Sequence, residues 1–137
     1  MTVEQEISRD GGQAVVIGSS GGIGHALMDN LQSGGAFSRV TGFSRSSNPA
    51  LDTLCEKSIA QAAAEIAGRN EPLRLLIVAS GFLHGEGMQP EKSFRDLDAA
   101  ALAHSMAVNA IGPAMVMKHF LPYFPRQGRA IFAVLSA

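Results

Sequence analysis

The residues with the clearest chemical potential form a glycine-rich stretch near the start of the chain. The run from Gly18 to Gly24 reads Gly-Ser-Ser-Gly-Gly-Ile-Gly and lies between an apolar segment, Ala14–Ile17, and an amphipathic one, Gly22–Gln32. Glycines there permit a tight turn and let a ligand approach the backbone closely. The N-terminus of the following helix offers N–H groups and a positive dipole end. The stretch therefore predicts a site for the diphosphate of a dinucleotide, with an ordinary Gly-Ser turn as the alternative.

A second candidate group, Ser44-Arg45, ends the next strand-like segment, Arg39–Ser44. In a dinucleotide site this strand end meets the adenine ribose, where a carboxylate favours NAD. An arginine can instead pair with a 2′-phosphate in bidentate fashion, whereas a carboxylate would repel it. The sequence therefore predicts NADP(H) in preference to NAD(H). The alternative is that Arg45 is a solvated surface residue.

These groups need elements to position them, and apolar segments alternate with helix-like ones along the chain. Strands are predicted at Ala14–Ile17, Arg39–Ser44, Leu73–Ala79 and Ala130–Ser136. Helices are predicted at Gly22–Gln32, Glu56–Ala67 and Asp98–Tyr123, the last with a kink at Pro113. Strands that are apolar throughout indicate a parallel sheet with helices on both faces. The expected fold is a doubly wound, Rossmann-type α/β sheet in three layers, formed by residues 13–137 after a tail of residues 1–12.

Composition excludes several classes of protein. The 137 residues are 46% hydrophobic with a net charge of -1, which fits one packed domain and offers no basic stripe for nucleic acid. No apolar run approaches the roughly 20 residues that span a bilayer, so no membrane partner is expected. Cys55 is the single cysteine, which excludes an internal disulfide. We therefore expect no metal site and a cytoplasmic location.

The glycine turn resembles a known family. Gly18-x-x-x-Gly22-Ile23-Gly24 matches the GxxxGIG turn of the short-chain dehydrogenase/reductase family. The glycines Gly18, Gly21 and Gly24 also fit the turn of extended, epimerase-like relatives. The resemblance implies that the cofactor phosphates contact the turn and the start of the helix, at Gly18, Ser19, Ser20, Gly22, Ile23 and Gly24.

Two further segments extend the resemblance. The run Asp52–Ile59 is similar to the family's D-x-T-D-E-x-S-V/I segment, which implies that Asp52 contacts the adenine amino group. Asp52 could also be a helix N-cap, and the two roles are compatible. Val78–Gly81 occupies the place of the family's N-N-A-G motif. The resemblance implies that the backbone beside the cofactor ribose and nicotinamide is that of Ala79, Ser80 and Gly81.

A segment in the long predicted helix favours the classical group of the family over the extended one. Val108–Pro113 resembles V-N-x-x-G-P, whose asparagine holds a backbone distortion and a water connected to the catalytic lysine. Asn109 takes that place and is expected to be buried and hydrogen-bonded, because its neighbours are apolar. The stretch Met88–Leu97, with residues 81–84, resembles the C-factor-like and carbonyl-reductase-like branch.

The resemblance also shows what is missing. Family catalysis uses a tyrosine and a lysine four residues later, but Tyr123 is followed at that spacing by Gln127. Ser136 lies at or one residue before the family's catalytic serine, and we expect it not to be competent. The resemblance implies the NADP(H)-binding, N-terminal portion of an oxidoreductase that transfers hydride between NADP(H) and a carbonyl or alcohol substrate. A non-catalytic dinucleotide-binding protein, acting as sensor or assembly partner, is the alternative.

An assembly is expected as well. The strand Ala130–Ser136 would be an apolar edge strand with unpaired backbone groups. The helix Asp98–Tyr123 corresponds to one that pairs between subunits in the family. Together these features imply a homo-oligomer or a self-associating chain.

Overall fold

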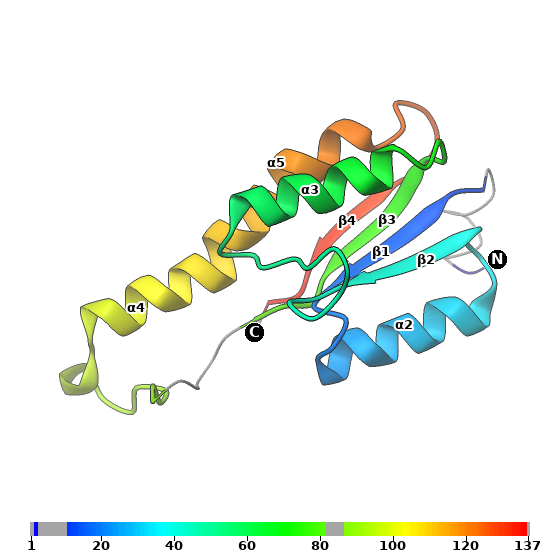
Figure 1. Cartoon of the computed structure of the whole chain (residues 1–137). Helices are drawn as coiled ribbons and strands as arrows, with labels where there is room; N and C mark the ends of the chain where they lie inside the picture. Colours follow the sequence, from blue (N-terminus) through cyan, green and yellow to red (C-terminus); the bar gives the residue numbers. More distant parts are fainter. Residues whose placement is uncertain (1, 3–10, 82–86, 137) are drawn as a thin grey trace.

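The computed structural model describes residues 2, 11–81 and 87–136, and within them the chain forms one parallel sheet with helices on both faces (Figure 1). The strand order is β2-β1-β3-β4, and every pair is parallel. The strands are β1 (Gln13–Ile17), β2 (Arg39–Phe43), β3 (Leu73–Val78) and β4 (Ile131–Val134). The predicted Rossmann-type α/β fold is confirmed. Most of the predicted tail, and residues 82–84 of the stretch that resembles the carbonyl-reductase-like branch, lie outside the described residues.

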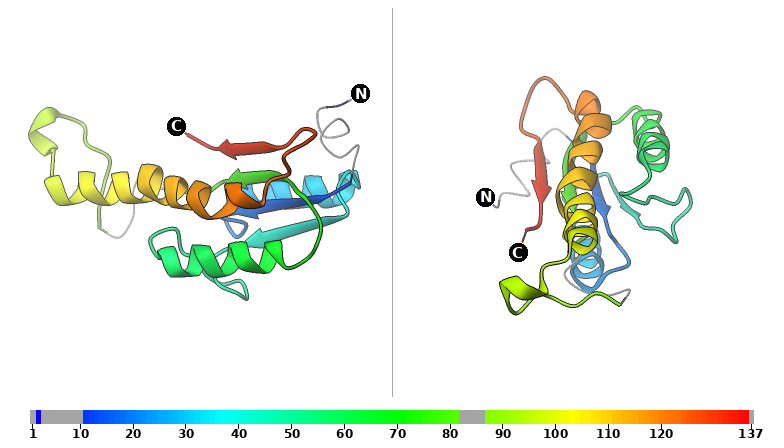
Figure 2. Two further views of the ribbon diagram at one scale, coloured as in Figure 1. Left: turned by 90° about the horizontal axis from the view of Figure 1, so that it is seen from above. Right: turned by 90° about the vertical axis from the view of Figure 1, so that its left-hand side faces the viewer.

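The helices form the two outer layers. Helix α2 (Gly22–Gly34) covers one face of the sheet, and α3 (Glu56–Ala67) and α5 (Gly112–Phe120) cover the other (Figure 2). Helix α4 (Ala99–Met106) and a π-helical turn, η2 (Ala107–Ile111), precede α5 in one continuous helix. A short 3-10 segment, η1 (Phe94–Asp96), precedes this helix, and another, η3 (Leu121–Tyr123), forms its last turn.

Strand β1 is the centre of the core because both of its faces are covered. Successive side chains of a strand point to opposite faces. Val15 and Ile17 pack with α3 and α5, while Ala14 and Val16 pack with α2. All four side chains are at most 1% exposed, which explains why the segment is apolar without alternation.

The long helix departs from its prediction in one place. We expected a kink at Pro113, but the irregularity is the π-helical turn Ala107–Ile111 just before it. Proline has no N–H to donate to the carbonyl four residues earlier, which is that of Asn109. The N–H of Gly112 reaches the Ala107 carbonyl five residues back, so the helix widens locally. The backbone distortion implied around Asn109 is therefore present.

The same continuous helix corrects an expectation about apolar runs. Ala99–Tyr123 spans 25 residues and is long and apolar enough to cross a membrane by length and composition alone. Core helices of soluble proteins meet the same criterion, and Val116 and Phe120 are fully buried against the sheet and α3. The length and composition of this helix are therefore equally consistent with a membrane-spanning helix and with the core helix of a soluble protein.

An ion-pair cluster joins the N-terminus of α3 to the C-terminal half of α5. Glu56 Oε1 accepts hydrogen bonds from Lys118 Nζ at 2.5 Å and, with that ring nitrogen protonated, His119 Nε2 at 2.8 Å. The hydrogen bond from Lys118, and then that from His119, lowers the pKa of Glu56 below its ordinary value. A carboxyl group whose pKa is lower in the folded state stabilises the fold at pH values above its ordinary pKa. This contribution to stability is lost as the pH falls through the lowered pKa.

Glu56→Gln is accordingly expected to lower the melting temperature slightly at neutral pH and not at all in strong acid. The effect is small because the carboxylate is exposed and screened by solvent. Thermal melts of both proteins from about pH 2 to pH 7 check this, with exposed Glu91→Gln as the control for a lost charge. A difference that stays constant over the whole pH range would contradict the assignment.

Candidate nucleotide-binding site

The glycine turn brings the end of β1 against β3 and the first turn of α2. Gly18 has a φ of 86°, and its N–H donates to the Phe43 carbonyl at 2.8 Å. A Cβ on Gly18 would lie 2.8 Å from the backbone nitrogen of Ser80, and a Cβ on Gly24 only 2.0 Å from the Gly18 carbonyl oxygen. Neither position therefore accommodates a side chain, and the two glycines are required for this close packing.

The outer side of the turn is open. A Cβ on Gly22 would meet no atom within 4 Å, and Ile23 is 64% exposed. Gly21, which precedes the helix, has no side chain that could cap the first N–H groups of α2. The start of α2 therefore offers backbone donors and a positive dipole end on an accessible surface.

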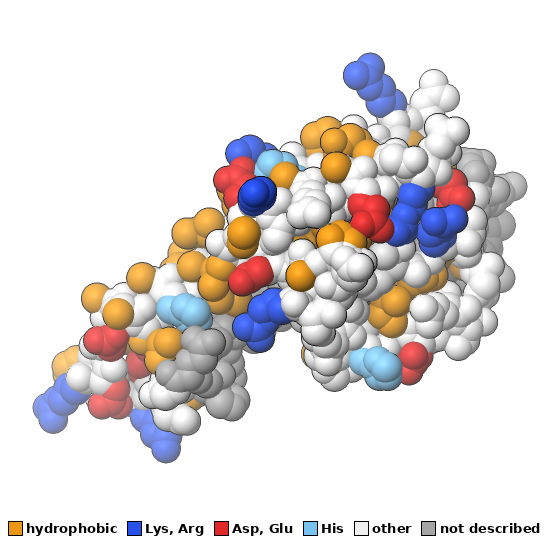
Figure 3. All heavy atoms as spheres, in the orientation of Figure 1, with side chains coloured by type: hydrophobic (Ala, Val, Ile, Leu, Met, Phe, Trp, Pro, Cys, Tyr) orange, Lys and Arg blue, Asp and Glu red, His pale blue; other side chains and the backbone are white. Residues whose placement is uncertain are grey.

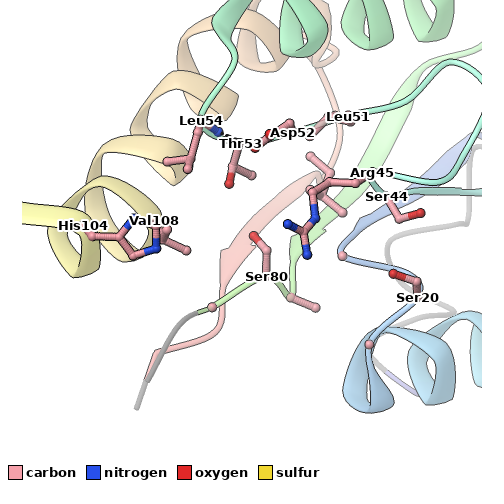
Figure 4. A pocket seen from close by; sticks show the side chains of 15 residues that line it. Ser20, Ser44, Arg45, Leu51, Asp52, Thr53, Leu54, Ser80, His104 and Val108 are labelled. Atoms are coloured by element: carbon pink, nitrogen blue, oxygen red, sulfur yellow. Dashed lines mark hydrogen bonds between the residues drawn. The ribbon is translucent and has the colours of Figure 1, made fainter. Parts of the chain in front are cut away.

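A cavity of about 300 Å³ opens beside this turn at the carboxyl ends of β1, β2 and β3 (Figure 4). The strand order reverses at β1, because β2 lies on one side of it and β3 on the other. Open α/β sheets bind their ligands at such a switch point. Of the predicted site residues, the cavity brings together Gly18, Ser20, Ser44, Arg45, Asp52, Ala79, Ser80 and Gly81. It also includes residues that were not predicted: Ile17, Gly21, Leu51, Thr53, Leu54, His104 and Val108.

Four predicted phosphate-binding residues do not line the cavity. Gly22, Ile23 and Gly24 belong to the start of α2 beside it. Ser19 supports the turn from behind: its N–H donates to the Phe43 carbonyl at 3.2 Å. A Cβ on Gly42 would come within 2.8 Å of the Ser19 hydroxyl, so glycine in β2 makes room for that side chain.

Arg45 lies in a short loop that is held by hydrogen bonds among its own residues. Ser44 is buried, and its hydroxyl lies 3.1 Å from that of Ser46. Ser47 accepts the Ser44 N–H at 2.9 Å, and its hydroxyl lies 2.8 Å from the Ser44 carbonyl. The Arg45 guanidinium points from this loop into the cavity, toward Ser80 (Figure 4). An exposed arginine held in this way can receive an anionic ligand group without giving up a buried partner.

The loop Leu51–Leu54 forms the upper wall. Asp52 Oδ1 accepts the Leu54 N–H at 2.9 Å, which closes a local turn. The N-cap of α3 is Cys55, so the alternative role of Asp52 as the N-cap is wrong. A Cβ on Gly112 would lie 2.9 Å from that of Thr53. The glycine of the Val108–Pro113 segment therefore lets the long helix pack against the loop that carries Asp52.

The far wall comes from the long helix. His104 and Val108 lie one helical turn apart and both point into the cavity (Figure 4). Their spacing was a usable signal, since residues four apart share a helix face and Val108 belongs to the matched segment. We did not predict either residue.

The two predicted catalytic positions lie outside the cavity. Asn109 is exposed, contrary to the expected burial, because no residue of α4 or η2 is buried in the described structure. Its Nδ2 donates to the Ser105 hydroxyl at 3.2 Å, and its Oδ1 lies 3.6 Å from where a Gly81 Cβ would be. Ser136 follows β4 and is exposed. Among the described residues, no group of three or more His, Cys, Asp or Glu side chains could hold a metal ion.

Solved structures share this architecture. No protein family model matches the sequence, and no curated protein does. The NADPH-bound carbonyl reductase from chicken fatty liver has a TM-score of 0.69 and 19% identity, over 82% of this chain and 48% of that one. A short-chain dehydrogenase from Streptomyces avermitilis has a TM-score of 0.68 and 20% identity, over 82% and 44%. Aldohexose dehydrogenase from Thermoplasma acidophilum has a TM-score of 0.69 and 17% identity, over 85% and 46%.

The chain thus spans about half the length of these structures. At such identities the likeness establishes the fold. The chain has the Rossmann-type α/β fold of short-chain dehydrogenases and carbonyl reductase, and its cavity lies at the switch point of the sheet.

Proposed function

We propose that this chain binds NADP(H) in the cavity and is the cofactor-binding portion of an oxidoreductase of the short-chain dehydrogenase/reductase type. The observation that carries the proposal is that the glycine turn and the Arg45 guanidinium both border one cavity at the switch point of the sheet. The volume of about 300 Å³ falls within the range of small-molecule sites. In such an enzyme the cofactor supplies or accepts a hydride, and the substrate is a carbonyl or an alcohol.

Each wall of the cavity has a role in this proposal. The amides at the start of α2 hold the diphosphate, for which Gly22 leaves space. Arg45 pairs with the 2′-phosphate. Asp52 accepts a hydrogen bond from the adenine amino group, and Ala79 to Gly81 form the floor beneath the sugar.

A second candidate is a dinucleotide-binding protein without catalysis, and the position of Tyr123 favours it for the chain taken by itself. Tyr123 lies beside Ala67 and Asn70, in a separate hollow at the C-terminal end of α3. It therefore cannot act as a proton donor in the proposed cofactor cavity. Binding of NADP(H) is common to both candidates, whereas hydride transfer is a property of the first only.

Binding can be tested separately from folding with Gly22→Val. The free variant is expected to melt at the temperature of the unchanged protein, because the space beside Gly22 is empty. NADPH at a hundred times its dissociation constant should stabilise the unchanged protein by about 2.7 kcal/mol, which raises the melting temperature by several degrees. The variant should lose this shift, since valine would occupy the place of the diphosphate.

Thermal shift assays with NADPH, with NADH and without ligand provide the measurement. If neither dinucleotide raises the melting temperature, the proposed function is wrong. A full shift in Gly22→Val would show that the ligand binds elsewhere.

We also propose that the chain forms a homo-oligomer or associates with itself. Apolar side chains gather along the long helix in Figure 3, and β4 forms one edge of the sheet. Exposed apolar area of this kind favours association, as do unpaired strand edges. The exposed residues on the helix include Leu102, Met106, Ile111, Met117 and Leu121.

A further inference from the structure

The floor of the cavity contains a buried hydroxyl group without a protein partner. Ser80 Oγ is inaccessible to solvent and makes no hydrogen bond to any part of the chain that the structure describes. Ser80 also lines the cavity. Buried hydroxyl groups in native proteins are nearly always hydrogen-bonded, because leaving one unpaired costs free energy. A hydroxyl left unpaired beside a binding cavity indicates a partner supplied by the ligand.

The position of Ser80 identifies which part of a ligand it would meet. Its backbone nitrogen is next to Gly18, 2.8 Å from where a Cβ on that glycine would lie. Its side chain points upward toward the loop that carries Asp52 and Thr53 (Figure 4). The Arg45 guanidinium approaches the same space from the opposite side. Ser80, the glycine turn and Arg45 thus line one part of the cavity together.

We infer that Ser80 Oγ is a cofactor-binding group that hydrogen-bonds the adenosine ribose, an inference that rests on the proposed function. In NADP(H) the adenosine ribose carries the diphosphate on its 5′ carbon and the extra phosphate on its 2′ carbon. With the diphosphate at the start of α2 and the 2′-phosphate at Arg45, the ribose must lie between them. Ser80 lines the cavity there, beside the Arg45 guanidinium. The motif that Val78–Gly81 resembles has alanine here, so the hydroxyl is a feature of this chain.

Ser80→Ala separates this role from that of Arg45. The variant should weaken binding of NADPH, NADH and adenosine 2′,5′-bisphosphate by the same factor of about five, because all three contain the ribose and lose one neutral hydrogen bond. The melting temperature of the free protein should stay the same or rise, since the substitution removes an unpaired buried hydroxyl. Ser33→Ala, which removes a hydroxyl from the exposed surface of α2, is the matched control and should change no affinity.

Isothermal titration calorimetry with the three ligands measures the factors. Unchanged affinities in Ser80→Ala would overturn the inference. A loss for NADPH and adenosine 2′,5′-bisphosphate but not for NADH would assign the hydroxyl to the 2′-phosphate and overturn it as well. A loss for the two dinucleotides alone would place the hydroxyl at their nicotinamide half, with the same consequence. Failure of the unchanged protein to bind any of the ligands would instead reject the proposed function, and the inference with it.

Discussion

Replacing Gly24 with alanine is expected to remove a large part of the folding stability of the chain. The new Cβ would lie 2.0 Å from the Gly18 carbonyl oxygen and 2.7 Å from its carbon, far inside contact distance. Both are backbone atoms, and Gly18 is held in place because its N–H donates to Phe43. The clash can be relieved only if α2 moves away from β1, which would open the core formed by Leu31 and Val16.

Overpacking of this kind costs about 1–3 kcal/mol and occasionally more, and contact with fixed backbone places this case at the upper end. A domain stable by roughly 5–15 kcal/mol would show such a loss clearly. Urea unfolding followed by circular dichroism measures it as a lower midpoint. Gly22→Ala is the control, because its Cβ would meet nothing within 4 Å. Equal midpoints for Gly24→Ala and the unchanged protein would contradict the packing described for the turn.

The second large effect is expected at Arg45, where aspartate should abolish the preference for NADPH over NADH. The substitution removes a charge-assisted, bidentate pair with the 2′-phosphate and puts a like charge in its place. Losing such a pair costs about 1.5–3 kcal/mol, and repulsion adds to it. The ratio of the NADPH and NADH dissociation constants should therefore change about a hundredfold. NADH binding should be unchanged or stronger, because NADH has no 2′-phosphate and a carboxylate at this strand end favours NAD(H).

The matched control is Arg39→Asp, which makes the same change of charge at the opposite end of β2. It should leave the ratio of dissociation constants unaltered apart from a small long-range effect that salt screens. Calorimetric titrations of both variants with both dinucleotides give the ratios. If the unchanged protein binds NADPH and NADH equally, Arg45 is a surface residue and the cofactor assignment is wrong.

Much of the fold follows from short-range patterns in the sequence. The bounds of α3 agree with the prediction because its apolar side chains recur at helical spacing and Gly68 ends the run. The strand β1 was recognisable because both of its faces are buried. The π-helical turn was not foreseen, although Pro113 signals an irregularity. The position of the π-helical turn depends on which backbone carbonyl has no N–H donor. That carbonyl lies one helical turn before the proline.

Site residues could be predicted where they belong to a motif that directly follows a strand. They could not be predicted where segments far apart in the sequence meet. Gly18 and Arg45 were identified because they follow directly on β1 and β2. The close approach of Ser19 to Gly42 was not foreseen, because no local pattern reveals that pair. The expected burial of Asn109 failed for a related reason. An apolar sequence neighbourhood shows that a helix has an apolar surface, but burial requires another element against that surface.

The long helix is anchored at one end only. Its C-terminal part holds Val116 and Phe120 in the core, whereas the described structure buries no residue of α4 or η2, and α4 projects past the end of the sheet in Figures 1 and 2. Local opening therefore costs less free energy in its first three turns than in its last two. His104 and Val108, which close the far side of the cavity, belong to the weakly held part. The cavity thus combines a rigid floor, made by strand ends in the core, with one wall that can yield to the shape of what enters.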